Sequence, residues 1–147
     1  MDHIEFANGL KVREKVALKS RNRFAGLLHL AVHVAMIFVL AVIVMSGGIL
    51  GWLAMMPLGI TLVFLFALEH EATHKTPFEN ARMNEVVGFV CGVVLLLPFQ
   101  WFRYFHMAHH RYTNDPGRDP ELLAGGAPDT RRGVILHVTG IPYWRGM

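Results

Sequence analysis

The chain has 147 residues, 53% of them hydrophobic, and a formal net charge of +3. Its mean hydropathy of +0.37 is high for a soluble domain of this length and favours a membrane protein. The single cysteine, Cys91, excludes an intramolecular disulfide. The basic residues gather beside apolar segments and form no recognisable nucleic-acid-binding motif, so nucleic acid is not an expected partner.

Two apolar segments near the N-terminus predict a pair of membrane-spanning helices. Residues 24–45 contain no Asp, Glu, Lys or Arg, and residues 49–68 form a second uncharged run. At about 1.5 Å of rise per residue, each reaches roughly 30 Å, which is the thickness of the hydrocarbon core of a bilayer. Because only a short Ser-Gly-Gly turn separates them, we expect a transmembrane hairpin in an all-α integral membrane protein.

The charges beside this hairpin predict its orientation. Residues 1–23 contain six basic side chains against three acidic ones, whereas the turn between the two helices carries no charge. The positive-inside rule therefore predicts that residues 1–23 form a cytoplasmic tail.

Two histidines lie inside the first predicted membrane helix. His29 and His33 are four residues apart, and their depth lies near the cytoplasmic leaflet. Ionisable side chains in a membrane are costly unless they find a partner. We expect both imidazoles to be uncharged and hydrogen-bonded to a neighbouring helix.

A third apolar run, residues 86–97, is too short to cross the membrane. As a helix it would be roughly 18 Å long before Pro98 ends it, and Asn84 is its expected N-cap. We expect a re-entrant or interfacial helix that returns to the cytoplasmic side. The segments before and after this run then lie at the same face of the membrane.

Histidines cluster in two short motifs on either side of this third run. The motifs are HEATH at residues 70–74 and HMAHH at residues 106–110, with His70, His74, His106, His109 and His110. Residues three or four apart share one face of a helix, so each motif can direct two imidazoles at one metal ion. Neutral imidazole suits zinc, copper and iron.

HEATH also fits the HExxH motif of zinc metalloproteases, in which Glu71 would be the general base. A catalytic zinc site normally takes three protein ligands and keeps one open position. Five histidines at one membrane face are too many for such a site and favour a two-metal centre, in which Glu71 would instead orient an imidazole. The membrane zinc metalloprotease is kept as an alternative.

The two histidine motifs, with a short hydrophobic run between them, resemble the first two histidine boxes of the membrane fatty acid desaturase superfamily. The segment RYTNDPGRDPEL after the second motif is also similar to that family, and the resemblance covers about residues 49–123. It implies an O₂-dependent dehydrogenation of a lipid acyl chain, with electrons from a ferredoxin, a cytochrome b5 or a similar carrier. Carotenoid or alkane hydroxylases and ketolases of the same superfamily are alternatives.

The resemblance also implies a non-haem centre of two iron ions. Its ligands, matched position by position, are His70, His74, His106, His109 and His110. Three carboxylates near the motifs are candidates for orienting those imidazoles: Glu71, Asp115 and Asp119.

The family pattern contains a third histidine box after two further helices, and residues 1–147 contain no match to it. We therefore expect this chain to be a single membrane domain that forms the N-terminal part of a longer fatty acid desaturase domain. Such a chain alone is expected to bind iron poorly and to be inactive.

Overall fold

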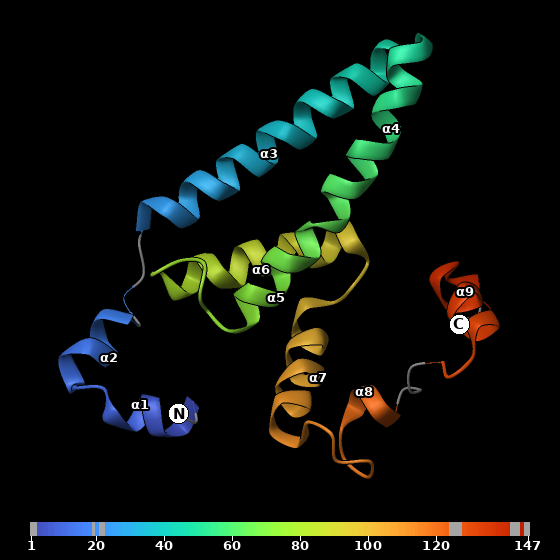
Figure 1. Ribbon diagram of the computed structural model, residues 1–147. Coiled ribbons are helices and arrows are strands. Elements are labelled where there is room, and N and C mark those ends of the chain that lie inside the picture. Colours follow the sequence, from blue (N-terminus) through green and yellow to red (C-terminus); the bar gives the residue numbers. More distant parts are fainter. Residues whose placement is uncertain (1–2, 19, 21–22, 124–127, 142–144, 146–147) are drawn as a thin grey trace. The chain divides into compact units, whose positions relative to one another are not determined.

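The computed structural model describes residues 3–18, 20, 23–123, 128–141 and 145. Over these residues the regular secondary structure consists of helices, with no strand, which confirms the all-α class (Figure 1). The chain divides into two compact units, residues 1–103 and residues 104–147, which are described separately below.

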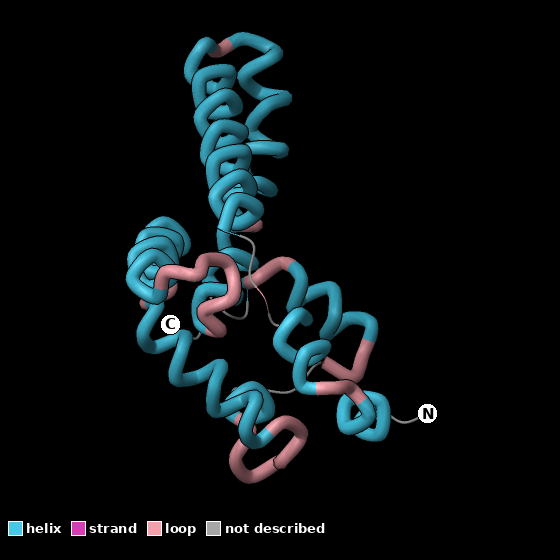
Figure 2. The backbone as a smooth tube through the Cα atoms, turned by 90° about the vertical axis from the view of Figure 1, so that its left-hand side faces the viewer, coloured by secondary structure: helices cyan, strands magenta, loops and turns pink. Residues whose placement is uncertain are grey.

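The first unit is built around a helical hairpin. Two short helices, α1 (His3–Gly9) and α2 (Val12–Leu18), precede α3 (Arg23–Ser46) and α4 (Gly48–Val63). The last two pack against each other near the turn that joins them, which Figure 1 shows, and Figure 2 shows them side by side.

The turn of the hairpin depends on glycine. Gly47 and Gly48 both have positive φ, 73° and 66°, a conformation that costs glycine no steric strain. Gly51 then lets α4 approach α3 closely, because a Cβ there would lie 3.0 Å from the carbonyl oxygen of Val44. The predicted hairpin is confirmed, and both arms are long and apolar enough to span a membrane.

The second apolar helix extends further than expected. Helix α5 (Leu65–Thr73) follows α4 after a single residue, Phe64, whose backbone stays in the right-handed helical region. Together α4 and α5 form one apolar helix of 26 residues. The helix thus continues beyond the predicted span of residues 49–68, and the HEATH motif occupies its last turns.

His33 is hydrogen-bonded to a neighbouring helix, as expected, whereas the same expectation for His29 stays a prediction. The Nε2 atom of His33 lies 2.9 Å from the carbonyl oxygen of Thr61 on α4. Thr61 donates its own hydroxyl to the carbonyl of Pro57, one turn earlier. Bonding to Thr61 satisfies the polar imidazole within the hairpin.

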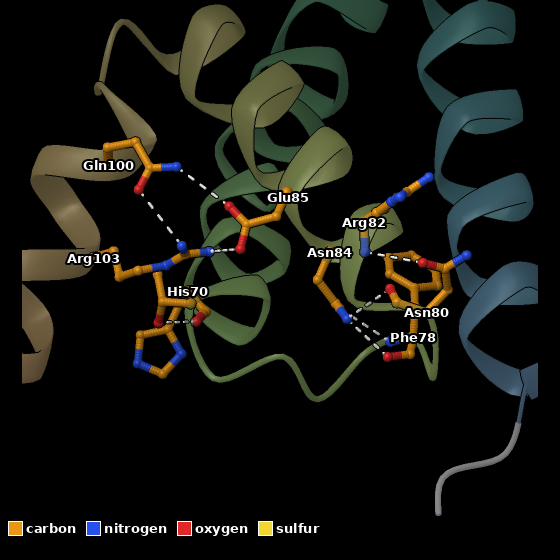
Figure 3. Close-up of polar contacts among 9 residues, drawn as sticks. His70, Phe78, Asn80, Arg82, Asn84, Glu85, Gln100 and Arg103 are labelled. Carbon is orange, nitrogen blue, oxygen red and sulfur yellow. Dashed lines mark hydrogen bonds and ion pairs between the residues drawn. The ribbon is translucent and has the colours of Figure 1, made fainter.

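Helix α6 (Ala81–Leu95) starts earlier than predicted. Asn80 is its N-cap and accepts a hydrogen bond from the backbone N–H of Arg82. The expectation that Asn84 caps this helix was wrong, because Asn84 is fully buried inside it. Its side chain instead donates to the carbonyl of Phe78 at 2.8 Å and accepts from the N–H of Phe78 at 3.2 Å (Figure 3). Asn84 thus ties the loop after α5 to α6, which packs on α5.

A sharp bend separates α6 from α7 (Phe99–Tyr112), with an angle of 102° between the two helices. Leu96 ends α6 in the left-handed conformation, and the N–H of Leu97 returns to the carbonyl of Gly92. Helix α6 has only 15 residues, in agreement with the short third run. The bent pair has the form of a broken span or a re-entrant loop, so the re-entrant reading stays a prediction.

The second unit contains the last turns of α7 and two short helices, α8 (Pro120–Leu123) and α9 (Arg131–Val138). Thr130 caps α9 by accepting a hydrogen bond from the N–H of Gly133. Residues 142–144 and 146–147 lie outside the described residues.

The buried Asn84 gives a test of this packing. We expect Asn84→Ala to lower the free energy of unfolding by about 2–3 kcal/mol, because it leaves the buried N–H and C=O of Phe78 unpaired. The measurement is chemical unfolding in detergent. Glu79→Ala, an exposed position in the same loop, is the control and should change stability little. Equal effects of the two substitutions would contradict the structural role of Asn84.

Candidate metal centre

The first histidine pair lies at the C-terminal end of α5. His70 and His74 are one helical turn apart, and their ring centroids are 5.1 Å from each other. The Nδ1 atom of His70 lies 3.2 Å from Oε1 of Glu71, and the hydroxyl of Thr76 donates to Oε2 of Glu71 at 2.6 Å. Holding Nδ1 in this way directs the other ring nitrogen of His70 toward a ligand. Glu71 thus lies where the sequence placed it, beside an imidazole.

The second histidine motif lies on α7, in the second unit. His106 and His110 face each other, with 3.0 Å between their Nε2 atoms and ring planes at 85°. Two nitrogens bound at right angles to one ion, each at about 2.1 Å, would lie about 3 Å apart. The separation of these two nitrogens therefore fits ligation of one metal ion.

His109 has a different environment from its two neighbours. Its Nδ1 lies 2.9 Å from Oδ1 of Asp119, which is almost fully buried. Asp119 also accepts hydrogen bonds from the backbone N–H groups of Asn114 and Glu121. Burial opposes ionisation of Asp119, but the hydrogen bond from His109 and the two backbone donors outweigh it and hold the pKa of this carboxyl below its usual range. A charged carboxylate therefore orients His109.

Asp115, the third candidate carboxylate, contacts no histidine in its described interactions. It accepts a hydrogen bond from the N–H of Gly117 at 3.0 Å and pairs with Arg118 at 3.1 Å. These contacts form the turn after α7.

Each unit contains one pair of imidazoles of the kind that binds a metal ion: His70 and His74 in the first unit, and His106 and His110 in the second. His109 is outside these pairs, although it has the buried carboxylate partner that ligating histidines commonly have. The donors are imidazoles, which suits iron, zinc or copper rather than magnesium or calcium.

Sequence reasoning missed the contacts that fix the start of α7. Arg103 pairs with Glu85 of α6 at 2.7 Å, and Gln100 donates to the other oxygen of Glu85 at 3.2 Å (Figure 3). The guanidinium of Arg103 also lies 4.5 Å from the ring centroid of Phe99. In the sequence, these contacts were indicated only by an acidic residue before the third apolar run and a basic residue after it.

Two aromatic contacts connect the start of α7 with the first histidine pair. The ring of Phe102 lies 5.2 Å from that of Phe66 and 6.5 Å from that of His70. On α6, Gly88 makes room for the ring of Phe99, because a Cβ there would lie 2.3 Å from it. The first turn of α7 is thereby packed against both α5 and α6 within the first unit.

Glu69, next to His70, was also missed. Its side chain is fully buried between α5 and α6, and neither carboxylate oxygen has a hydrogen-bond partner among the described residues. A Cβ on Gly92 would lie 3.1 Å from Oε1 of Glu69, so the glycine makes room for it. The sequence signal was a lone acidic residue late in an apolar helix.

Comparison with known proteins decides the family. A family model described as fatty acid desaturase matches residues 46–145, which include both histidine motifs and the turn that holds Asp119. The chain belongs to the fatty acid desaturase family. Its membership gives no support to the zinc metalloprotease alternative and agrees with the two helices that can span a membrane.

Curated desaturases also match part of the chain. A sphingolipid delta(4)-desaturase DES1 of Drosophila melanogaster is 34% identical over 92 residues, covering 58% of this chain and 29% of the relative. An sn-1 oleoyl-lipid 12-desaturase of Picosynechococcus is 32% identical over 104 residues, covering 63% and 30%. A fatty acid desaturase of Bacillus subtilis is 27% identical over 84 residues, covering 57% and 20%. The matches thus span less than a third of these relatives, and no solved structure matches significantly.

The ion pair at the start of α7 gives a second test. In a double-mutant cycle of Glu85→Gln and Arg103→Met, we expect a coupling energy of about 1 kcal/mol, because Arg103 is largely buried and also bonded to Gln100. Unfolding in detergent provides the four free energies. The exposed pair of Asp115 and Arg118 is the control, with an expected coupling close to zero. Coupling at Glu85–Arg103 no larger than at this control would contradict the proposed anchoring.

Proposed function

We propose that this chain supplies the histidine-box part of a membrane desaturase that dehydrogenates a lipid acyl chain with O₂. The observation that carries the proposal is the combination of family membership with two histidine motifs whose imidazoles are held by carboxylates. The five proposed iron ligands are His70, His74, His106, His109 and His110. Iron is proposed rather than zinc because an unactivated C–H bond requires a redox metal.

The residues of the chain would prepare the site in two ways. Glu71 and Asp119 each hold the Nδ1 side of an imidazole, which would fix the tautomer and leave Nε2 to bind a metal ion. The contacts of Arg103 and Phe102 fix the start of α7, the helix that carries the second motif. When bound, two iron ions would supply the oxidising chemistry with O₂, and an electron carrier such as a ferredoxin or cytochrome b5 would reduce the centre.

We further propose that both motifs lie at the cytoplasmic face of the membrane. The basic residues before α3 favour a cytoplasmic N-terminus, and a hairpin of α3 with the continuous helix α4–α5 returns the chain to that side. A re-entrant α6–α7 pair would keep the second motif there. A lipid acyl chain could then reach the site from the bilayer.

Iron retention by the isolated chain is the first test of the site. Five histidines are few ligands for two ions that take about four to six each, so we expect fewer than two tightly held irons per chain after anaerobic reconstitution. Replacing His70 and His74 together by Ala should reduce the retained iron further, whereas His137→Ala should not. Two tightly held irons per chain, or equal retention by all variants, would contradict the proposal.

Asp119 gives a sharper test of the second motif. We expect Asp119→Asn to weaken metal binding about 10- to 100-fold, because the uncharged amide orients and polarises His109 less well. Titration with Co²⁺, followed by its absorption bands, measures the affinity. Asp115→Asn is the matched control in the same turn, since Asp115 contacts Gly117 and Arg118. A similar loss in both variants would mean that the turn, and not the imidazole contact, matters.

Activity should be tested with the complete coding frame that contains this chain, expressed in membranes. We expect a new carbon–carbon double bond in a lipid acyl chain, detected as a loss of two mass units, only with O₂ and a reducing system. His106→Ala should abolish the product while the protein remains in the membrane. Incorporation of oxygen from ¹⁸O₂ into the lipid without a double bond would instead indicate a hydroxylase.

A further inference from the structure

A groove of about 1070 Å³ lies between α3 and α5, within the first unit. Pockets that bind small ligands typically measure about 300–1,000 Å³, so this groove is large enough for a long ligand. One wall is a face of α3, and the other is formed by Phe64, by α5 and by the loop that follows. Leu18 of α2 and Ser20 also line the groove.

The close approach of α3 to the loop shapes one end of the groove. A Cβ on Gly26 would lie 2.0 Å from the carbonyl oxygen of Pro77, so the helix backbone rests on the loop. Residues on the next turns of α3, His29, Val32 and Met36, then line the groove away from that contact.

Polar groups in the groove gather near this end. His29 of α3 lines it opposite Glu71 of α5 and Thr76 of the loop. Further along, the lining is apolar and includes Val32, Met36, Phe64 and Leu68. The polar imidazole of His33 is already engaged by Thr61. The groove therefore has one polar end and one long apolar part.

We propose that this groove binds a single-chain lipid whose polar end is an alcohol or an amine. The apolar part would hold the hydrocarbon chain, since its burial is favourable. At the polar end, each oxygen of Glu71 accepts one contact, from His70 or from Thr76, and a carboxylate oxygen has room for a second donor. A neutral His29 can accept or donate one more hydrogen bond.

Charge selects the class of head group. A phosphate or carboxylate head would lie beside the carboxylate of Glu71, and like charges repel each other. An alcohol donates a hydrogen bond to that carboxylate, and an amine adds a favourable charge. The groove thus favours hydrogen-bond donors and disfavours anionic heads.

The groove would bind the substrate of the proposed desaturase. Only the role of the lipid as a substrate rests on the proposed function; lipid binding in the groove does not. Glu71 contacts both the groove and His70, so a lipid bound here lies next to the first histidine motif. Lipid binding itself needs no metal, and its failure can be distinguished from a failure of the iron site.

The test uses the full chain, free of iron, in phosphatidylcholine nanodiscs. The probe is a C16 alcohol with a photoreactive diazirine on its chain, and cross-linked peptides are mapped by mass spectrometry. We expect labelling of groove residues on α3 and α5. Hexadecanol and hexadecylamine should compete at least about tenfold better than hexadecyl phosphate, the effect of about one hydrogen bond to a charged group. Equal competition by the phosphate would overturn the head-group assignment.

Variants locate the site. Ala67→Phe on α5 and Val32→Phe on α3 fill the groove from opposite walls, at exposed positions where the larger ring meets no packed core. Both should remove most of the labelling. Ala35→Phe is the matched control, an exposed position of α3 outside the groove lining, and should leave it unchanged. His29→Leu should reduce the preference for the alcohol over the phosphate. Unchanged labelling in both filling variants would overturn the proposal.

Discussion

The sharp bend between α6 and α7 is the constraint on which the second histidine motif depends. Leu96 ends α6 in the left-handed conformation, and Pro98 cannot continue the helix. The direction in which α7 starts is then fixed by the ion pair between Arg103 and Glu85 and by the fit of Phe99 over Gly88. An apolar helix long enough to cross the membrane would place the two motifs at opposite faces. The proposal that both motifs lie at one face therefore requires the bent pair to be re-entrant.

Carboxylates beside imidazoles are the recurring chemical feature of the candidate site. Glu71 follows its histidine directly in the sequence, whereas Asp119 reaches His109 from ten residues away through a turn. Both arrangements occupy Nδ1, which fixes the tautomer of a ligating imidazole. In the proposed centre, charge-assisted hydrogen bonds thus organise the ligands before a metal arrives. The same carboxylate, Glu71, also lines the groove along α3.

The sequence predicted the features that composition and spacing control directly. The hairpin followed from two uncharged runs, and the hydrogen bond of His33 to a neighbouring helix followed from the cost of an unpaired imidazole in a membrane. The predicted ends of the helices were less accurate. Asn84 looks like a cap because asparagine favours caps, but Asn80 is available four residues earlier and Asn84 is buried against Phe78. The second helix continues beyond its apolar run because helical backbone geometry does not depend on hydropathy alone.

Side-chain contacts between different helices and within turns could not be predicted from the sequence. Glu85 and Arg103 are 18 residues apart, and only the bend between their helices brings them together. The choice of Asp119 over Asp115 as the partner of His109 depends on the conformation of a turn that both residues share. The buried carboxylate of Glu69 was equally hidden, because an acidic residue at the end of an apolar helix normally faces water.

The central claim is that both histidine motifs bind the same iron centre. X-ray absorption at the iron edge tests it most directly, with protein loaded anaerobically with less than one Fe²⁺ per chain so that the tightest site fills first. We predict several imidazole nitrogens per iron, and fewer when either His70 and His74 or His106 and His110 are replaced by Ala. An imidazole count that does not change when one of the two motifs is removed would contradict a shared centre.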